Sequence, residues 1–325
     1  MEKEKFYDGY LTDVSGVSLG HFENMDSPTG VSVAIFKDGA TAGVDVRGGA
    51  PGTRETDLLK PENLVDKVHS IFLSGGSAYG INASAGIMKY LEEENIGMDV
   101  GVCKVPIVTG AVIFDLAIGS PFIRPDFDMG YKACQSATTN DKSNGLVGAG
   151  TGASVGKILG NDYSMKSGLG QASIKVNDLV VSAMTALNAF GDIYDDERNT
   201  QIAGVYDRNK KKFLDTQEIY LGKQKDYNAF KGRNTTIALV CTNAKFTKAN
   251  CNKVSQMAHD GFARSIRPVH TMFDGDTIFT AATGYVEADV SLVGMLAAKA
   301  ISRSIANAIY YSKSYEGFIA FNDKK

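Results

Sequence analysis

The sequence contains few cysteines and no long apolar run. Its four cysteines are scattered without a Cys-x-x-Cys pair, which argues against a disulfide framework and a zinc knuckle and favours a reducing cytoplasm. No stretch approaches the roughly 18 uninterrupted apolar residues of a membrane span. The charged start, Met1 to Lys5, lacks the apolar region of a signal peptide. We therefore expect a cytoplasmic protein with no membrane partner.

A large excess of charge of either sign is absent as well. The formal net charge is −3, and no block rich in Lys or Arg is present, so we expect no nucleic-acid partner. Hydrophobic residues at 43% and charged residues at 22% are typical of a soluble globular protein. Only 7 prolines stand against 35 glycines, which indicates many tight turns and close backbone approaches. A length of 325 residues fits one large domain or two.

Metal-binding patterns are missing too. The four histidines, His21, His69, His259 and His270, show no His-x-x-x-His spacing and have no cysteine partners. The run Asp274-Gly275-Asp276 lacks the further carboxylates of a calcium loop. We therefore expect neither a metal ion nor a cofactor.

Two glycine-containing segments approach known motifs without completing them. Gly148 to Ala153 matches the G-x-G-x-x-A of a dinucleotide site, but no acidic residue follows about 20 positions later after a convincing strand. Gly75 to Tyr79 approaches the G-x-S-x-G elbow of serine hydrolases, with Tyr79 where the final Gly is required. His259 or His270 would have to complete that triad. Neither motif supports a function by itself.

Hydrophobic periodicity predicts strands and helices in separate blocks, and therefore an α+β fold with an antiparallel sheet. An Asp-Gly turn at Lys37 to Gly39 predicts a hairpin between two strands. The polar segment 192–233 is predicted to be a surface linker, and residues 145–172 to form loops and bends. The expected strands are 31–36, 42–46, 71–73, 105–116, 237–240 and 276–282, and the expected helices are 81–94, 129–137, 248–265 and 291–311.

One junction carries candidate chemistry. Thr235 and Thr236 stand where a small polar turn meets an apolar strand, Ile237 to Val240. A Thr hydroxyl is a poor nucleophile unless a base lies beside it, and the α-amine of an N-terminal Thr is such a base. A cut between Asn234 and Thr235 would create that amine and, with it, an amide hydrolase. The alternative is that both threonines are ordinary strand residues.

Four other polar residues suit this chemistry. Asp274 and Asp276 flank a glycine and project to the same side of an extended segment, where they can hold an amine or raise the basicity of a nucleophile. Lys157 can supply positive charge, and Asn188 an amide donor, to a developing oxyanion. Each also has an ordinary alternative, since Lys157 fits a surface loop and Asn188 fits a turn cap.

Taken together, the motifs stand in one order that resembles a family of self-cleaving peptidases. This family comprises the L-aminopeptidase/D-esterases, the β-peptidyl aminopeptidases and the nylon-oligomer endo-hydrolases. The resemblance covers about residue 10 to residue 310, and it is specific in combination although no single motif is decisive. The segments that carry it are 49–57, 75–80, 105–116, 148–157, 188–192, 234–236 and 267–277.

The resemblance implies a single αββα sandwich over residues 1–325, related in architecture to the N-terminal-nucleophile hydrolases. Two intertwined chains of one self-cleaved precursor, 1–234 and 235–325, would form it. The family also implies a tetramer or a larger assembly. Matched by motif, the implied catalytic residues are Thr235 as the nucleophile, the acidic pair Asp274 and Asp276, Asn188 and Lys157, with Asn234 left behind by the cleavage.

The implied substrate is a short peptide, an amino-acid amide or a 6-aminohexanoate oligomer, hydrolysed through an acyl-enzyme. The Asn-Thr-Thr junction and the Asp/Asp pair are similar to the nylon-oligomer hydrolase branch. One position departs from the pattern, because Phe114 stands where active relatives would align a Tyr. Tyr79 and Phe114 are the candidate substrate-binding residues, with Tyr79 as a replacement for the missing hydroxyl. Two alternatives are an acyltransferase similar to ornithine acetyltransferase, and a non-catalytic member that never matures.

Overall fold

The computed structural model describes residues 6–222 and 234–324 of the chain. The main sheet has nine strands, eight of them in the order β10-β11-β16-β18-β2-β4-β7-β3, and β1 pairs with β2. The pairs β16–β18 and β4–β7 are parallel, and the other pairs are antiparallel. The strands are β1 (Ser18–Asn24), β2 (Thr29–Val46), β3 (Thr53–Arg54), β4 (Lys67–Ser74), β7 (Val108–Val112), β10 (Leu169–Val176), β11 (Leu179–Ala186), β16 (Ile237–Ala244) and β18 (Thr277–Val286).

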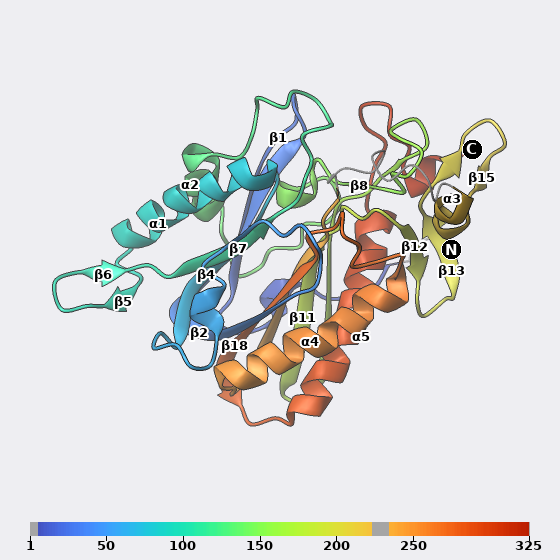
Figure 1. Cartoon of the computed structure of the whole chain (residues 1–325). Helices are drawn as coiled ribbons and strands as arrows, with labels where there is room; N and C mark the ends of the chain where they lie inside the picture. Colours follow the sequence, from blue (N-terminus) through green and yellow to red (C-terminus); the bar gives the residue numbers. More distant parts are fainter. Residues whose placement is uncertain (1–5, 223–233, 325) are drawn as a thin grey trace.

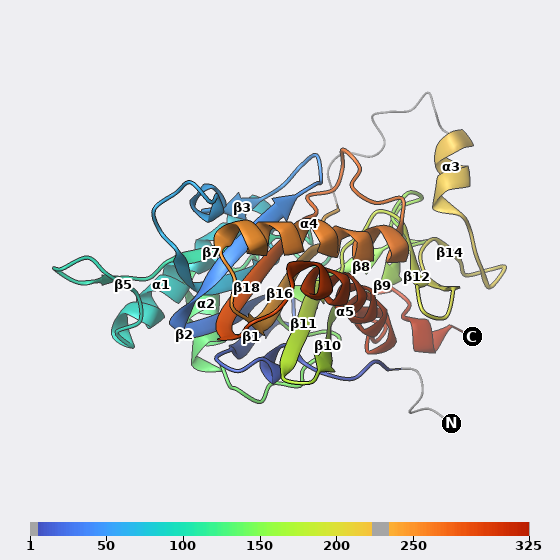
Figure 2. The same cartoon turned by 90° about the horizontal axis from the view of Figure 1, so that it is seen from below.

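Helices cover the sheet in two pairs (Figure 1). α4 and α5 lie side by side against one part of the sheet, and α1 and α2 pack together at the other, as the view in Figure 2 also shows. The α-helices are α1 (Ala83–Glu93), α2 (Phe127–Gln135), α3 (Thr216–Gly222), α4 (Lys248–Ser265) and α5 (Val290–Tyr310). The described 3-10 helices are η1 (Leu11–Asp13), η2 (Asp57–Leu59), η3 (Ser77–Asn82), η4 (Gly148–Gly150) and η6 (Phe321–Asp323).

The two halves of the nine-stranded sheet, joined where β18 pairs with β2, form two layers. Three apolar layers separate these halves from each other and from the two helix pairs. The first layer, which includes Phe72 and Ile87, joins α1 and α2 to strands β2, β4 and β7. The second lies between those strands and β11, β16 and β18, and includes Leu239. The third packs the other face of β11, β16 and β18 against α4 and α5, and includes Val240 and Phe262. The layers therefore follow the αββα order expected from the sequence.

The burial of the central strand β16 explains why its first five residues, Ile237 to Cys241, form a continuous apolar run. All eight of its residues are buried. Consecutive side chains of a strand point to opposite faces, so Leu239 enters one apolar layer and Val240 the next. A strand that is covered on both faces has no solvent-facing positions and therefore shows no alternation of polar and apolar residues.

Helix α5 is also apolar because it is buried. Among the described residues it is the one helix that is long and apolar enough to cross a membrane. However, 78% of the 18-residue apolar stretch within it is buried inside the protein. Ile301, Ile305 and Ile309 belong to the layer that it shares with α4 and the sheet. Its composition is that of a core helix.

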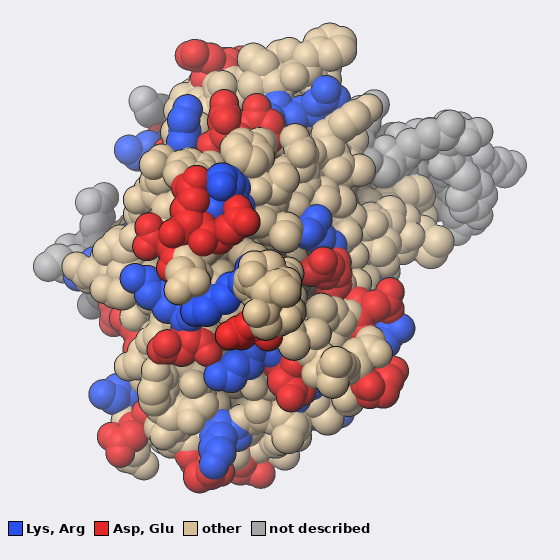
Figure 3. All heavy atoms as spheres, turned by 90° about the vertical axis from the view of Figure 1, so that its left-hand side faces the viewer, with Lys and Arg blue, Asp and Glu red and all other residues tan. Residues whose placement is uncertain are grey.

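Smaller pairings complete the fold, and the β5–β6 hairpin projects from the body in Figures 1 and 2. Figure 3 shows that Lys and Arg are interspersed with Asp and Glu on the face that it presents. The small sheets are β12 (Asp192–Asp195) with β13 (Thr200–Ala203) and β17 (Ile266–Arg267), β14 (Tyr206–Asp207) with β15 (Lys212–Phe213), β5 (Met98–Asp99) with β6 (Lys104–Val105), and β8 (Ser154–Val155) with β9 (Met165–Lys166).

Two predictions about elements are wrong. The hairpin at Lys37 to Gly39 does not form, because both predicted strands belong to the single long strand β2, whose register with β4 shifts between Ile35 and Ala40. The expected linker 192–233 contains four short strands and α3, and its residues 223–233 lie outside the described residues. At least one charged side chain of this segment is buried and does not face solvent. Asp195 is in the interior, where it accepts hydrogen bonds from two tyrosine hydroxyls at 2.7 Å.

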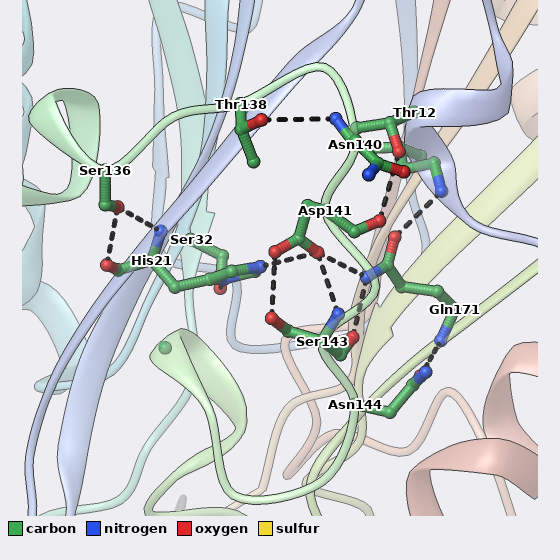
Figure 4. Close-up of polar contacts among 12 residues, drawn as sticks. Thr12, His21, Ser32, Ser136, Thr138, Asn140, Asp141, Ser143, Asn144 and Gln171 are labelled. Atoms are coloured by element: carbon green, nitrogen blue, oxygen red, sulfur yellow. Dashed lines mark hydrogen bonds and ion pairs between the residues drawn. The ribbon is translucent and has the colours of Figure 1, made fainter.

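A buried polar cluster links the N-terminal segment to β1, β2 and β10 (Figure 4). His21 Nδ1 lies 2.8 Å from Ser32 Oγ, and His21 Nε2 lies 3.4 Å from Asp141 Oδ1. Asp141 also accepts from Ser143 Oγ at 2.8 Å and Gln171 Nε2 at 2.9 Å. Burial acts to raise the pKa of Asp141, but His21 and Ser143 outweigh it and lower the pKa to about 2. Because Ser32 is fully buried, we interpret this Ser-His-Asp arrangement as structural.

We expect Asp141→Ala to lower the free energy of unfolding at pH 7 by roughly 2–3 kcal/mol, because buried donors lose their acceptor. The carboxylate stabilises the fold above its unfolded pKa of about 3.9, and this contribution is lost as the pH falls through about 2. The difference between wild type and variant therefore shrinks in acid. Urea unfolding at pH 7 and pH 3 measures it, with exposed Asp162→Ala as the control. Equal stability of the two variants at pH 7 would contradict the prediction.

Candidate active site

The strand register brings distant segments together at the start of β16. β11 pairs with β16 antiparallel, with Ala186 opposite Ile237, and β18 pairs with β16 parallel, with Thr277 opposite Ile237. Asn188, just after β11, and Asp276, just before β18, therefore lie beside the residues that precede β16. Those residues are Asn234, Thr235 and Thr236, which are 4%, 4% and 0% exposed.

Thr235 is held by its backbone, and its hydroxyl contacts a carbonyl group. Its N–H donates to the carbonyl oxygen of Asn188 at 3.0 Å, and its Oγ1 donates to the carbonyl oxygen of Asn234. Thr235 and Asn234 line a cleft of about 110 Å³. The other described lining residues are Ala50, Pro51, Gly52, Ser77, Ala78, Val112, Ile113, Phe114 and Phe273. The Thr235 side chain therefore lies between a peptide carbonyl and an open space.

Lys157 and Asn188 form one side of the site. Lys157 Nζ donates to Asn188 Oδ1 at 2.5 Å, and Asn188 Nδ2 donates to the carbonyl oxygen of Phe114 at 2.9 Å. The backbone N–H of Ser154 donates to the same Oδ1 at 3.2 Å. Asn188 is fully buried, so its amide does not cap a surface turn. It connects the amine of Lys157 to the wall of the cleft.

The amine of Lys157 exchanges a proton near neutral pH. Burial lowers its pKa to about 7, although Asp274 and Asp115 oppose the shift, and Lys166 adds to it. Lys166 is itself fully buried, and burial lowers its pKa to about 7 as well. Its Nζ donates to two backbone carbonyl oxygens at 2.7 and 2.9 Å. The Gly-rich segment thus carries two buried amines beside the site.

Asp274 and Asp276 form the opposite side, and their surroundings differ. Asp276 Oδ1 accepts from the N–H of Thr236 at 2.8 Å, while its Oδ2 accepts from the backbone N–H and Nδ1 of His270 at 3.1 and 2.9 Å. Asp274 Oδ2 accepts from the N–H and Oγ1 of Thr271 at 3.0 and 2.5 Å. Burial, followed by the charge of Asp276, raises the pKa of Asp274 to about 7. Two neighbouring carboxyls in unlike environments are suited to different roles.

Gly275, between the two acids, leaves the space that the Thr235 side chain occupies. A Cβ at this position would lie 2.8 Å from Thr235 Oγ1 and 2.7 Å from the carbonyl oxygen of Ala50. The segment at Ala50 runs along the same loop, because its N–H donates to the carbonyl oxygen of Asp274 at 2.8 Å. The sequence marks segment 49–57 as a family motif but does not predict this contact, although the glycines of the segment are typical of a close backbone approach.

Of the two candidate substrate-binding residues, Phe114 lines the cleft. It also lines a smaller cavity of about 40 Å³ together with Lys157. Tyr79 is absent from the described lining, is 59% exposed and packs against Arg124, whose guanidinium carbon lies 3.7 Å from the ring centroid. Ser77 lines the cleft instead, in a left-handed conformation with φ 54°. The position of Tyr79 therefore does not support it as the replacement hydroxyl. Ser77, which the sequence offered only as the serine of an incomplete hydrolase elbow, lines the cleft.

The layer order and the cleft at the start of a central strand define the class of fold as that of the N-terminal-nucleophile hydrolases. An L-aminopeptidase D-Ala-esterase/amidase from Ochrobactrum anthropi matches with a TM-score of 0.71 at 14% identity, covering 96% of this chain and 88% of that one. A β-aminopeptidase from Burkholderia sp. matches with a TM-score of 0.65 at 19% identity, covering 95% and 88%. At these identities the likeness establishes the fold alone, and it confirms the predicted fold class.

The family follows from comparison of sequences. The chain belongs to peptidase family S58, whose model matches residues 9–320. An uncharacterized aminopeptidase of Mycobacterium leprae is 37% identical over 340 residues, covering 94% of this chain and 91% of the relative. A 6-aminohexanoate-oligomer endohydrolase of Paenarthrobacter ureafaciens is 31% identical over 279 residues, covering 85% and 75%. The predicted family is confirmed, and the chain is a hydrolase of peptide or amide bonds.

We expect Gly275→Ala to reduce amide hydrolysis by about 100-fold, because the new Cβ would displace Thr235 Oγ1 or the loop that carries the acids. Gly222→Ala is the matched control, since no atom of the described residues lies within 4 Å of a Cβ built at that position. Steady-state hydrolysis and thermal unfolding of both variants measure the effect. Full turnover in the Gly275 variant would show that the close approach does not constrain Thr235.

Proposed function

We propose that the chain is a self-processing amide hydrolase with Thr235 as its N-terminal nucleophile. The observation that carries this proposal is the contact of Thr235 Oγ1 with the carbonyl group of Asn234, inside a cleft. A hydroxyl that already contacts the carbonyl group needs little movement to attack its carbon. The amine of Lys157 on one side and the two carboxyls on the other supply the charges that such an attack requires.

In the precursor, Thr235 Oγ attacks the carbonyl carbon of Asn234 and gives up its proton. We assign this proton to Asp274, because a pKa of about 7 lets that carboxyl accept and return a proton at neutral pH. The tetrahedral intermediate collapses, the C–N bond breaks, and the returned proton completes the α-amine of Thr235. Water then hydrolyses the ester at Oγ, which leaves residues 1–234 with a carboxylate and residues 235–325 with a free amine.

In the mature enzyme, Thr235 Oγ attacks the amide carbon of the substrate. The α-amine of Thr235 takes the proton directly or through a water molecule and passes it to the leaving amine. Water then deacylates the ester and regenerates the hydroxyl. Lys157 supplies positive charge to the oxyanion. Asn188 acts indirectly on the same side, because its side-chain oxygen accepts a hydrogen bond from the Lys157 amine and so positions that amine.

The substrates proposed are short peptides, amino-acid amides and 6-aminohexanoate oligomers. The descriptions of the relatives as an aminopeptidase and a 6-aminohexanoate-oligomer endohydrolase support this range. The aromatic Phe114 at the cleft offers no hydroxyl, so its contribution to preference is apolar. A panel of aminoacyl-p-nitroanilides, β-peptides and the oligomers ranks the substrates, and N-acetylornithine tests the acyltransferase alternative. A cytoplasmic tetramer stays a prediction, which size-exclusion chromatography and cell fractionation address.

We expect Thr235→Ala to leave one full-length band in denaturing electrophoresis and to abolish amide hydrolysis, because it removes the attacking oxygen. Wild-type protein should give two fragments, with the smaller one starting at Thr235 by N-terminal sequencing. Thr236→Ala is the matched control, because Thr236 Oγ1 has no hydrogen-bond partner among the described residues, and this variant should still be cut. A Thr235→Ala chain that is cut after Asn234 would refute the assignment.

We expect self-processing to slow as the pH rises above about 7, because Lys157 then loses the proton that gives it positive charge. The charged form is present below that pKa and is lost above it. Lys157→Arg keeps its charge across this range. The rate of self-processing of this variant, although lower than that of the wild type, should therefore no longer fall between pH 7 and 9. Pulse-labelled precursor followed at several pH values provides the measurement. An unchanged alkaline limb in the Arg variant would exclude Lys157 as its source.

A further inference from the structure

His270 lies directly behind the acidic pair and contributes two donors to one oxygen atom. Its backbone N–H and its ring Nδ1 both donate to Asp276 Oδ2, at 3.1 and 2.9 Å. The other oxygen of the same carboxylate accepts from the N–H of Thr236 at 2.8 Å. The nucleophile Thr235 is the residue before Thr236. A continuous line of hydrogen bonds therefore runs from His270 through Asp276 to the backbone next to the nucleophile.

The backbone of His270 adopts a conformation that few side chains tolerate. Its φ is 56°, in the left-handed region where Asn, Asp and His are enriched among residues with a Cβ. This conformation accompanies the alignment of backbone and ring donors on the same carboxylate oxygen. Such strain persists only where the surrounding structure maintains it, and it concentrates at functional sites.

The far side of the ring indicates what sets its orientation. His270 Nε2 is buried and has no hydrogen-bond partner among the described residues. The ring packs against His259 and Phe262, with centroids 4.7 and 6.1 Å away. Within the described residues, therefore, no hydrogen bond at Nε2 holds the ring in place. The bond from Nδ1 to the carboxylate of Asp276 is the polar contact that orients it.

We propose that His270 is a positioning residue, which holds Asp276 so that its second carboxylate oxygen fixes the backbone amide beside Thr235. It is absent from the described lining of the cleft, so it acts through Asp276 and not on the substrate. The inference rests on the proposed role of Thr235. It predicts slower attack by the nucleophile, both in self-processing and in turnover, with an unchanged KM.

Three variants distinguish the effect of the side-chain donor from the effects of ring packing and of the backbone conformation. His270→Asn keeps a side-chain N–H donor and tolerates a positive φ but loses the ring. His270→Gly tolerates the same φ without any side-chain donor. His270→Phe keeps the ring packing against His259 and Phe262 but cannot donate. Cleavage after Asn234 is timed on freshly translated chains, and kcat and KM are measured on mature protein.

The positioning role predicts that the Asn variant stays within about threefold of wild type, whereas the Gly and Phe variants process and turn over about 10- to 100-fold more slowly. An active Phe variant with an inactive Asn variant would show that the ring acts by packing and would overturn the proposal. Equal activity of all three would overturn it as well. If the Gly or Phe chain does not fold, a folded but inactive Asn variant still refutes the positioning role.

Thr235→Ala in the same assays keeps this inference apart from the proposed function. If that variant is still cut and still hydrolyses amides, the nucleophile assignment fails, whatever the His270 variants do. If it is inert while every His270 variant is fully active, the nucleophile assignment stands and only the role of His270 fails.

Discussion

The parallel pairing of β16 with β18 is the constraint on which the site depends. Parallel strands begin at the same edge of a sheet, so the residues that precede them must meet. With Thr277 opposite Ile237, the acids before β18 lie beside the threonines before β16. The antiparallel partner β11 ends at this edge and adds Asn188. One register therefore assembles a cleft from segments that are far apart in the chain, and a shift of either strand would disperse it.

Much of the fold follows from local pattern, and the rest depends on long-range pairing. The helical periodicity of 248–265 predicts α4 with the bounds that the structure has, and strand 237–240 corresponds to the first part of β16. The expected strand 105–116 shortens to β7, because Val105 pairs in the β5–β6 hairpin on one side, while Ile113 and Phe114 line the cleft on the other. Parallel pairs and the unbroken β2 escape local reasoning, since an Asp-Gly pair permits a tight turn but does not require one.

For the candidate site, the sequence predicted a set of residues that lie together, but not the environment of each residue. Motif order identified Thr235, Asn188, Lys157 and the two acids, and the structure brings these residues together. Their protonation behaviour depends on burial, which single residues in a sequence do not reveal. His270 shows the same limit, because its spacing excluded a metal site, whereas its contact with Asp276 depends on a turn conformation.

The position of the short C-terminal part within the sheet has a consequence for reversibility. Residues 235–325 contribute β16 and β18, which lie between β11 and β2, together with both helices of one outer layer. A cut after Asn234 would remove one covalent bond and leave both flanking ladders and both apolar layers intact. Folding of the precursor is a reaction of one molecule, whereas renaturation of the cut protein would require two chains to meet. Renaturation of the cut protein would therefore include a concentration-dependent step, the meeting of its two chains, that folding of the uncut chain lacks.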